Sequence, residues 1–207
     1  MQELGLFPLP IVLVPTERIP LHIFEPRYRE LITECIENDA QFGLVLATGD
    51  GAVHEIGTRA TVTQVLEELP DGRMNIVVEG GERFRLLELT RGRSFTTAIV
   101  EPVADLDEPP AEDEVERVLE RFAQLAEAAK SDVEVPDASS PSFDFEIVAH
   151  VDFGVDAKQE LLAMTSPRAR VKRLIELLDV ALESIRLEHV LRERADRNGK
   201  VAPLDPE

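Results

Sequence analysis

The stretch LFPLPIVLVPTERIPLHIFEPRYRELITECI, residues 6–36, predicts the first elements of the fold. Residues 6–14 are apolar and extended, and Pro8 and Pro10 lack an N–H group, so we predict a strand at a sheet edge or barrel seam. From Pro26 the apolar residues recur at the three-and-four spacing of an amphipathic helix. A proline suits the first helical position because no hydrogen bond is lost there. The predicted buried face consists of Tyr28, Leu31, Ile32, Cys35 and Ile36.

The part of the chain up to residue 104 is dominated by strand patterns. Residues 15–26, with three prolines, read as an irregular connection into the helix. Pro70-Asp71-Gly72-Arg73 is a turn, since proline fixes φ and glycine allows positive φ. Gly80-Gly81 interrupts the next apolar run as a bulge or sharp bend. We predict about six strands, mostly antiparallel, that curl into a small barrel with one inserted helix. They lie at 6–14, 41–48, 57–69, 74–79, 83–89 and 94–103.

The remainder of the chain has helical periodicity. Residues 105–112 (DLDEPPAE) predict a linker, because Pro109-Pro110 suits neither a strand nor a helix interior. Helices are predicted from Asp113 to about 130, at 143–151, at 156–164, and from 166 to about 194. The fold class is therefore α+β. We predict a barrel subdomain at 1–104, a helical subdomain at 113–196 and a flexible tail at 197–207.

Several motifs resemble the N-terminal, substrate-binding domain of Lon protease. Leu6-Phe7-Pro8-Leu9 and the run PLHIFEPRYR (residues 20–29) resemble the opening of that domain. Gly57-Thr58, the turn at 70–73, Glu79-Gly80 and Arg83-Phe84-Arg85 then follow in the family's order. The resemblance implies a PUA-like pseudo-β-barrel followed by a helical part. It also implies the substrate-recognition role of an ATP-dependent protease, in a domain that also occurs as a small protein of its own.

Composition restricts the kind of partner. The net charge of the 207 residues is −19, and residues 101–146 contain fifteen acidic but only three basic residues. Such a surface repels phosphate, so no nucleic-acid partner is expected. No apolar run is long enough to span a bilayer, there is one cysteine, and no secretory leader pattern opens the chain. We therefore expect a soluble cytoplasmic protein with no membrane partner.

Catalytic equipment is not recognisable in the sequence. The single Gly-Lys pair, Gly199-Lys200, precedes a valine and does not form a phosphate-binding loop. The four histidines are dispersed without metal-ligand spacing, and no lysine stands in a context that suggests a base beside a nucleophilic serine. We expect no catalytic residue, no cofactor and no metal, and hence a protein that acts without ATP and is not an enzyme.

The candidate site lies in the middle of the opening stretch. It consists of Leu21, His22, Ile23, Phe24, Glu25 and Arg27, which we expect to border a groove for an extended apolar polypeptide. In a purely structural alternative, the apolar members plug the barrel while Glu25 and Arg27 hold the turn. The preferred function is non-catalytic binding of unfolded or exposed polypeptide segments, or of a partner protein. The alternative is a small-molecule-binding or enzymatic domain that uses the cleft between barrel and helices, and RNA binding ranks below both.

Overall fold

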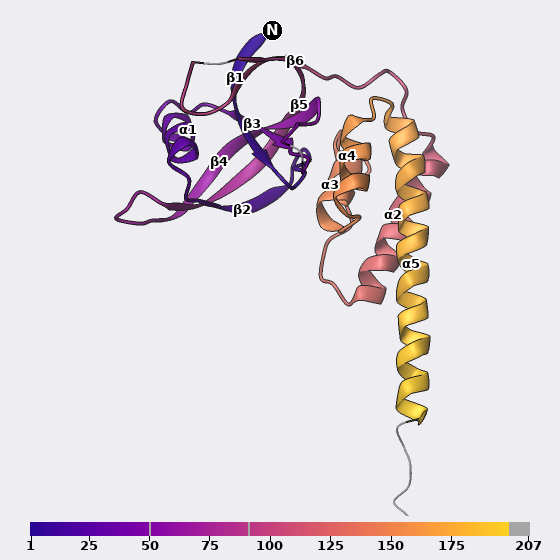
Figure 1. The fold of residues 1–207 in the computed structure, drawn as a ribbon. Coiled ribbons are helices and arrows are strands. Elements are labelled where there is room, and N and C mark those ends of the chain that lie inside the picture. Colours follow the sequence, from indigo (N-terminus) through magenta and orange to yellow (C-terminus); the bar gives the residue numbers. More distant parts are fainter. Residues whose placement is uncertain (50, 91, 199–207) are drawn as a thin grey trace, which may run out of the picture.

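Six strands form one curled sheet in the first half of the chain (Figure 1). The strands are β1 (Gln2–Leu9), β2 (Arg18–Ile23), β3 (Phe42–Leu46), β4 (Ile56–Glu68), β5 (Met74–Thr90) and β6 (Thr97–Pro102). Their order is β2-β5-β4-β3-β1-β6, and β5 pairs additionally with β6, which gives a pseudo-barrel rather than a regular closed barrel. The computed structural model describes residues 1–49, 51–90 and 92–198, without the side chains of 189, 190 and 192–198. Among the described pairings only β1–β3 is parallel, so the predicted mostly antiparallel, α+β fold is confirmed.

The strands differ from the prediction in three places. The first strand was predicted at 6–14, whereas β1 spans Gln2–Leu9. Residues 15–26, predicted as irregular, contain β2, whose proline is tolerated because this strand has a neighbour on one side only. The strand predicted at 74–79 and the one predicted at 83–89 are a single strand, β5. Gly80-Gly81 lies inside it, where the pairing with β4 shifts register. The glycines therefore form a bulge that bends one long strand instead of ending it.

One helix is inserted among the strands, as predicted. Helix α1 (Pro26–Glu37) lies against the sheet on the side away from the other helices (Figure 1). It buries four of the five predicted residues: Tyr28, Leu31, Ile32 and Cys35. Ile36 is exposed, so its predicted burial is wrong. It lies on the last turn of the helix, at the border of the face that contacts the sheet.

Cys35 should react slowly with alkylating reagents in the folded protein. Its thiol is buried, and this burial raises its pKa to about 11. Because the thiolate is the reactive form, we expect alkylation by iodoacetamide at pH 8 to be roughly a hundredfold slower than for an unhindered cysteine. Mass spectrometry of quenched time points measures the rate, and the same reaction in urea should restore it. Equal rates with and without urea would contradict this burial.

The second half of the chain is helical. It comprises α2 (Glu112–Ala129), α3 (Phe143–His150), α4 (Val155–Ala163) and α5 (Pro167–Asn198), the last of which extends well beyond its neighbours (Figure 1). The core of these helices also includes Val12, Val14, Leu46 and Ile56 from the sheet part. The two parts therefore share one apolar core, and the predicted division into subdomains remains a prediction. Helix α5 includes 197 and 198, which were predicted as tail, and residues 199–207 of that predicted tail lie outside the described residues.

Candidate functional site

The predicted site residues lie at the free edge of the sheet, on β2 and at the start of α1. They do not all face the same way. Ile23 is buried in the core between α1 and the sheet, so it cannot border a groove. Phe24 is 59% exposed, and Glu25 accepts a hydrogen bond of 2.9 Å from Arg27. The structure thus combines the two readings of this segment: part of it is structural, and part of it presents an apolar surface.

His22 is the best-oriented polar side chain at this edge. Its Nδ1 lies 2.7 Å from Oδ1 of Asn75, and the Asn75 amide nitrogen donates to Glu67 over 2.9 Å. Since that amide orientation leaves only an oxygen for His22, the Nδ1 atom must carry the proton. The ring also stacks on Phe24, with 5.9 Å between centroids. In the neutral ring, Nε2 is therefore left as an acceptor beside an exposed aromatic side chain.

Apolar side chains from the β4–β5 hairpin extend this surface. Leu66 is 53% exposed, and together with Leu21, His22 and Ile76 it lines a shallow hollow of about 570 Å³. We call the surface formed by Pro20, Leu21, His22, Phe24 and Leu66 the edge patch. Leu66 was missed by sequence reasoning. The available signal was the adjacent apolar pair Val65-Leu66 near the hairpin turn, where the strand extends beyond the core and both residues are exposed.

Pro20 limits the backbone hydrogen bonds that the free edge of β2 can form. It pairs with Val77 of β5, and it has no N–H to donate to that neighbour. Its nitrogen must therefore face the unpaired edge, as prolines in sheets do. An incoming strand would find a missing donor in the middle of β2. The edge patch consequently suits binding through side chains better than binding by strand addition.

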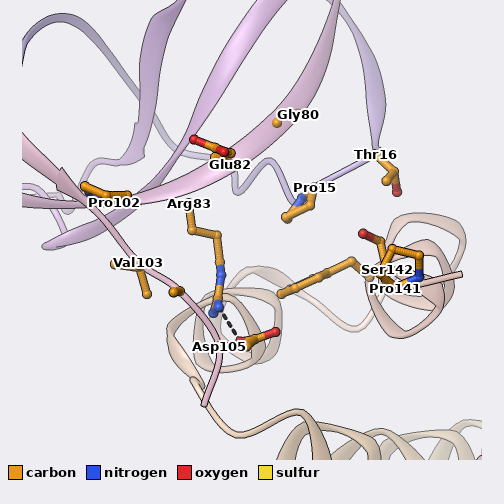
Figure 2. Close-up of a pocket in the computed structure, with 13 residues that line it drawn as sticks. Pro15, Thr16, Gly80, Glu82, Arg83, Pro102, Val103, Asp105, Pro141 and Ser142 are labelled. Carbon is orange, nitrogen blue, oxygen red and sulfur yellow. Dashed lines mark hydrogen bonds and ion pairs between the residues drawn. The ribbon is translucent and has the colours of Figure 1, made fainter. Parts of the chain in front are cut away.

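A second hollow, of about 450 Å³, lies between the sheet and the helices (Figure 2). Its sheet side includes Pro15, Thr16 and Gly80, and Pro141 and Ser142 face them from the segment before α3. Arg83 crosses the hollow from β5 and pairs with Asp105 on the linker. This is the cleft that the alternative, small-molecule or enzymatic, hypothesis requires.

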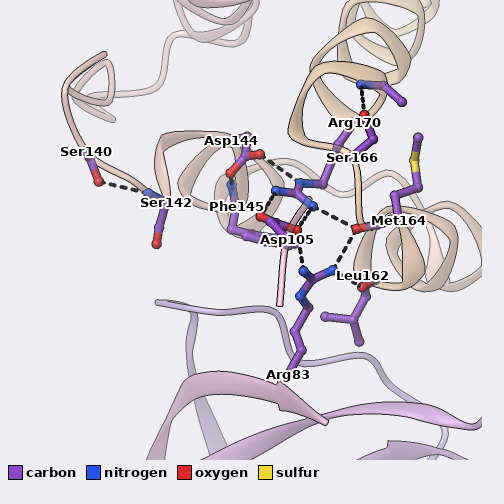
Figure 3. Close-up of polar contacts among 11 residues, drawn as sticks. Arg83, Asp105, Ser140, Ser142, Asp144, Phe145, Leu162, Met164, Ser166 and Arg170 are labelled. Atoms are coloured by element: carbon purple, nitrogen blue, oxygen red, sulfur yellow. Dashed lines mark hydrogen bonds and ion pairs between the residues drawn. The ribbon is translucent and has the colours of Figure 1, made fainter. Parts of the chain in front are cut away.

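The floor of this cleft is a network of ion pairs in which each charged group has a partner of opposite charge (Figure 3). Arg83 donates to the carbonyl oxygens of Leu162 (2.9 Å) and Met164 (2.6 Å) at the end of α4. Arg170 of α5 donates to both carboxylate oxygens of Asp105, at 3.1 and 2.8 Å, and to Asp144 at 2.7 Å. We call Arg83, Asp105, Asp144 and Arg170 the clasp. Its groups join β5, the linker, α3 and α5.

The carboxylates of the clasp have shifted pKa values for structural reasons. Burial alone would raise the pKa of Asp105, but the hydrogen bonds and charges of Arg170 and Arg83 outweigh it and lower the pKa. Burial raises the pKa of Asp144, although Arg170 opposes this. Opposite shifts would suit an acid–base pair. Here, however, Asp144 and Arg170 have side chains only 3% and 1% exposed, so a substrate could not reach them. The geometry is that of a structural ion-pair network.

Comparison with known proteins identifies the family. A family model for the ATP-dependent protease La (LON) substrate-binding domain matches residues 3–180 of the chain. The chain belongs to this family. Lon protease of Rhizobium meliloti (strain 1021) is 27% identical over 202 residues, which are 90% of this chain and 25% of that protein. The chain thus spans about a quarter of the length of such Lon proteases. The resemblance predicted from the sequence motifs is confirmed.

Solved structures of Lon N-terminal domains agree with this assignment. The crystal structure of the Lon N-terminal domain protein from Xanthomonas campestris has a TM-score of 0.66 and 25% identity, covering 85% of this chain and 98% of that chain. The N terminal domain of Mycobacterium avium complex Lon protease has a TM-score of 0.58 at 15% identity, over 86% of this chain and 98% of that one. The second similarity shows the shared fold alone.

The motifs that resemble the Lon family have identifiable places in this structure. The run at 20–29 forms the end of β2 and the first turn of α1, and the turn at 70–73 closes the β4–β5 hairpin. Together they frame the edge patch. Arg83, from the third motif, is the member of the clasp that reaches from the sheet to the helices. The motifs therefore mark both candidate sites of this Lon-family domain.

Proposed function

We propose that this Lon-family domain is a non-catalytic binding module that holds exposed apolar segments of other polypeptides at the edge patch. The observation that supports this most directly is the exposure of two large apolar side chains near a hydrogen-bonded His22: Phe24, which stacks on its ring, and Leu66, which lines the same hollow. Burying such surface against a partner is favourable, and exposed apolar clusters typically mark interaction sites. The family's substrate-binding role supports the same reading.

The mode of binding in this proposal is side-chain capture. An apolar side chain of the partner fills the hollow beside Leu21 and Leu66, while Nε2 of His22 accepts a backbone N–H from the bound segment. Pro20 disfavours continuous strand addition, so no particular backbone register is imposed. A module of this kind accepts many sequences, which fits unfolded polypeptides or exposed segments of a partner protein.

The same features disfavour the other hypotheses. The charged groups of the clasp in the cleft between sheet and helices are engaged with one another and with backbone carbonyls, which disfavours their use in an enzymatic reaction. The net charge of −19 disfavours RNA. None of the helices in residues 1–49, 51–90 and 92–198 is long and apolar enough to cross a bilayer. The proposal places the module in the cytoplasm, acting without ATP and without a cofactor.

Fluorescence anisotropy with a labelled, permanently unfolded polypeptide, such as reduced and carboxymethylated lactalbumin, tests the proposal. The wild-type chain should bind saturably. The double variant Phe24→Ser/Leu66→Ser should bind at least about tenfold more weakly, since truncating two central apolar contacts removes on the order of 1–3 kcal/mol. Leu89→Ser is the matched control, because Leu89 is 51% exposed but lies on β5 outside the edge patch.

Two results would refute this assignment. One is the lack of saturable binding to any unfolded polypeptide. The other is an equal loss of affinity in Leu89→Ser and in the double variant, which would show that apolar exposure in general, and not the edge patch, is responsible. Circular dichroism of each variant verifies that the fold is intact before affinities are compared.

A further inference from the structure

One open end of the pseudo-barrel contains a polar pocket that the proposed function does not use. The interior of the barrel is apolar, with Leu4, Val45, Phe84 and Val100 among its members. Two residues along the chain from this apolar layer, within the strands or just outside them, the residues are mostly polar. Side chains two apart share a face of a strand, so these positions form the rim of the open end, where Arg59 is buried and the others are exposed. The rim positions are Gln2, Gln41, Arg59, Glu82 and Pro102, and all five line one pocket of about 740 Å³.

Two glycines show that Arg59 faces the barrel interior. Arg59 pairs with Gly43 of β3 and lies two residues from Gly57 on β4. A Cβ atom at Gly43 would come within 2.7 Å of the Phe84 ring, and one at Gly57 within 2.8 Å of it. Both glycines therefore face the interior, and Arg59 faces the same way. With no side chain at Gly43, the side chains of Phe84, Leu6 and Leu4 pack against the strand there, and this apolar layer lies below Arg59.

Arg59 is a buried cation without a protein partner. The residue is only 8% exposed, yet its guanidinium makes no hydrogen bond, ion pair or aromatic contact with the part of the chain that the structure describes. Arg83 and Arg170, the other buried arginines, are fully paired. None of its nitrogens is among the fully enclosed side-chain atoms that lack a hydrogen-bond partner, so the unpaired donors open into the pocket, where solvent reaches them. The pocket therefore holds a preformed donor group directed at something other than this chain.

The charges around Arg59 indicate which class of ligand the pocket can bind. A planar guanidinium matches the two oxygens of a carboxylate. Asp39 and Glu82 also line the pocket, so a simple anion would meet two carboxylates as well as one guanidinium. A group that carries both charges avoids this repulsion. Leu4 and Val100 add apolar wall at the inner end of the pocket.

We propose that this pocket binds a free α-amino acid. Its carboxylate pairs with Arg59, its ammonium lies between Glu82 and Asp39, and its side chain contacts the apolar end near Leu4 and Val100. The pocket shares no residue with the hollow of the edge patch. Amino-acid binding and polypeptide binding are thus separate properties, and either can fail without the other.

Thermal unfolding in the presence of each standard L-amino acid at millimolar concentration tests this proposal. At least one should raise the melting temperature, because a ligand that binds only the folded state stabilises it. For that amino acid, the carboxamide and the N-acetyl derivative, which lack the carboxylate and the ammonium respectively, should bind at least about tenfold more weakly by calorimetry. Arg59→Met should abolish binding, whereas Arg85→Met, which changes an exposed arginine on β5, should leave it unchanged.

The ligand-free stability of Arg59→Met separates a binding role from a structural one. If Arg59 has no partner in the protein, replacing it with an apolar side chain of similar length should leave the melting temperature unchanged or raise it. A fall of several degrees would show that Arg59 holds the fold and would overturn the proposal. So would the failure of every amino acid to bind, or an N-acetyl derivative that binds as tightly as its parent.

Discussion

Replacing Arg170 with methionine should lower the free energy of unfolding by about 3–5 kcal/mol, the range observed when one member of a buried ion pair is removed. The side chain of Arg170 is 1% exposed and donates to Asp105, Asp144 and the carbonyl of Met164. Methionine preserves most of the volume but leaves Asp144, with a side chain 3% exposed, as an unpaired carboxylate. Urea denaturation followed by circular dichroism measures the loss.

Arg173→Met is the matched control for this experiment. Arg173 is on the same helix, less than a turn away, and pairs with Glu160 and Glu176 at the surface. Exposed pairs contribute about 1 kcal/mol or less, so this variant should remain close to wild type. Adding Asp144→Leu to Arg170→Met should recover part of the loss, because the unpaired charge is then gone. If Arg170→Met were no less stable than Arg173→Met, the clasp would not hold sheet and helices together.

Replacing Gly80 with alanine should lower the free energy of unfolding by about 2–3 kcal/mol, as expected for overpacking a rigid site. The added Cβ atom would lie 2.1 Å from the carbonyl oxygen of Val14. This neighbour is backbone and cannot rotate away. It is also held in place, because Thr16 donates to the Gly80 carbonyl (2.8 Å) and Gly80 donates to the Glu17 carbonyl (2.9 Å).

Gly81→Ala provides the comparison within the same bulge. A Cβ atom there has its nearest neighbours at 3.5 Å, an ordinary contact distance. We expect this variant to differ from wild type by less than about 1 kcal/mol, the usual scale of a glycine-to-alanine change where the backbone permits it. Thermal and urea unfolding of both variants should therefore give clearly different results. Similar losses in the two would indicate that flexibility of the bulge, and not the approach of Val14, requires glycine.

Local patterns predicted most of the fold because they reflect local physics. The helix that begins at Pro26 and the turn at 70–73 depend on spacing and on backbone preferences of proline and glycine, which neighbours in the sequence reveal. The errors occur where contacts with residues far away in the sequence determine the local structure. The bulge predicted at Gly80-Gly81 is confirmed, but the two strands predicted on either side of it are one, because pairing with β4 on both sides of the bulge keeps β5 continuous. β2 was missed because its order comes from β5 rather than from its own sequence.

The candidate site was predicted as one segment, and the structure completes it with another. Phe24 and His22 were in that segment, whereas Leu66 and Asn75 come from a hairpin some forty residues later, which pairs with β2 in three dimensions. Ile23 was included because consecutive residues cannot be told apart without knowing which face the core covers. Arg59 had no sequence signal at all, since an arginine in a strand usually reaches solvent.

The sequence by itself determined the family, the helices and most of the strands, and an acidic composition that disfavours nucleic acid, because motifs, periodicity and charge are properties of the chain without its partners. Only the tertiary structure decided which polar groups meet. Arg83 and Arg170 lie far apart in sequence and are neutralised by the same carboxylate, Asp105. Arg59 is 8% exposed and pairs with no carboxylate in the described part of the chain. Pairing of buried charges depends on distances across the fold, and no local pattern encodes those distances.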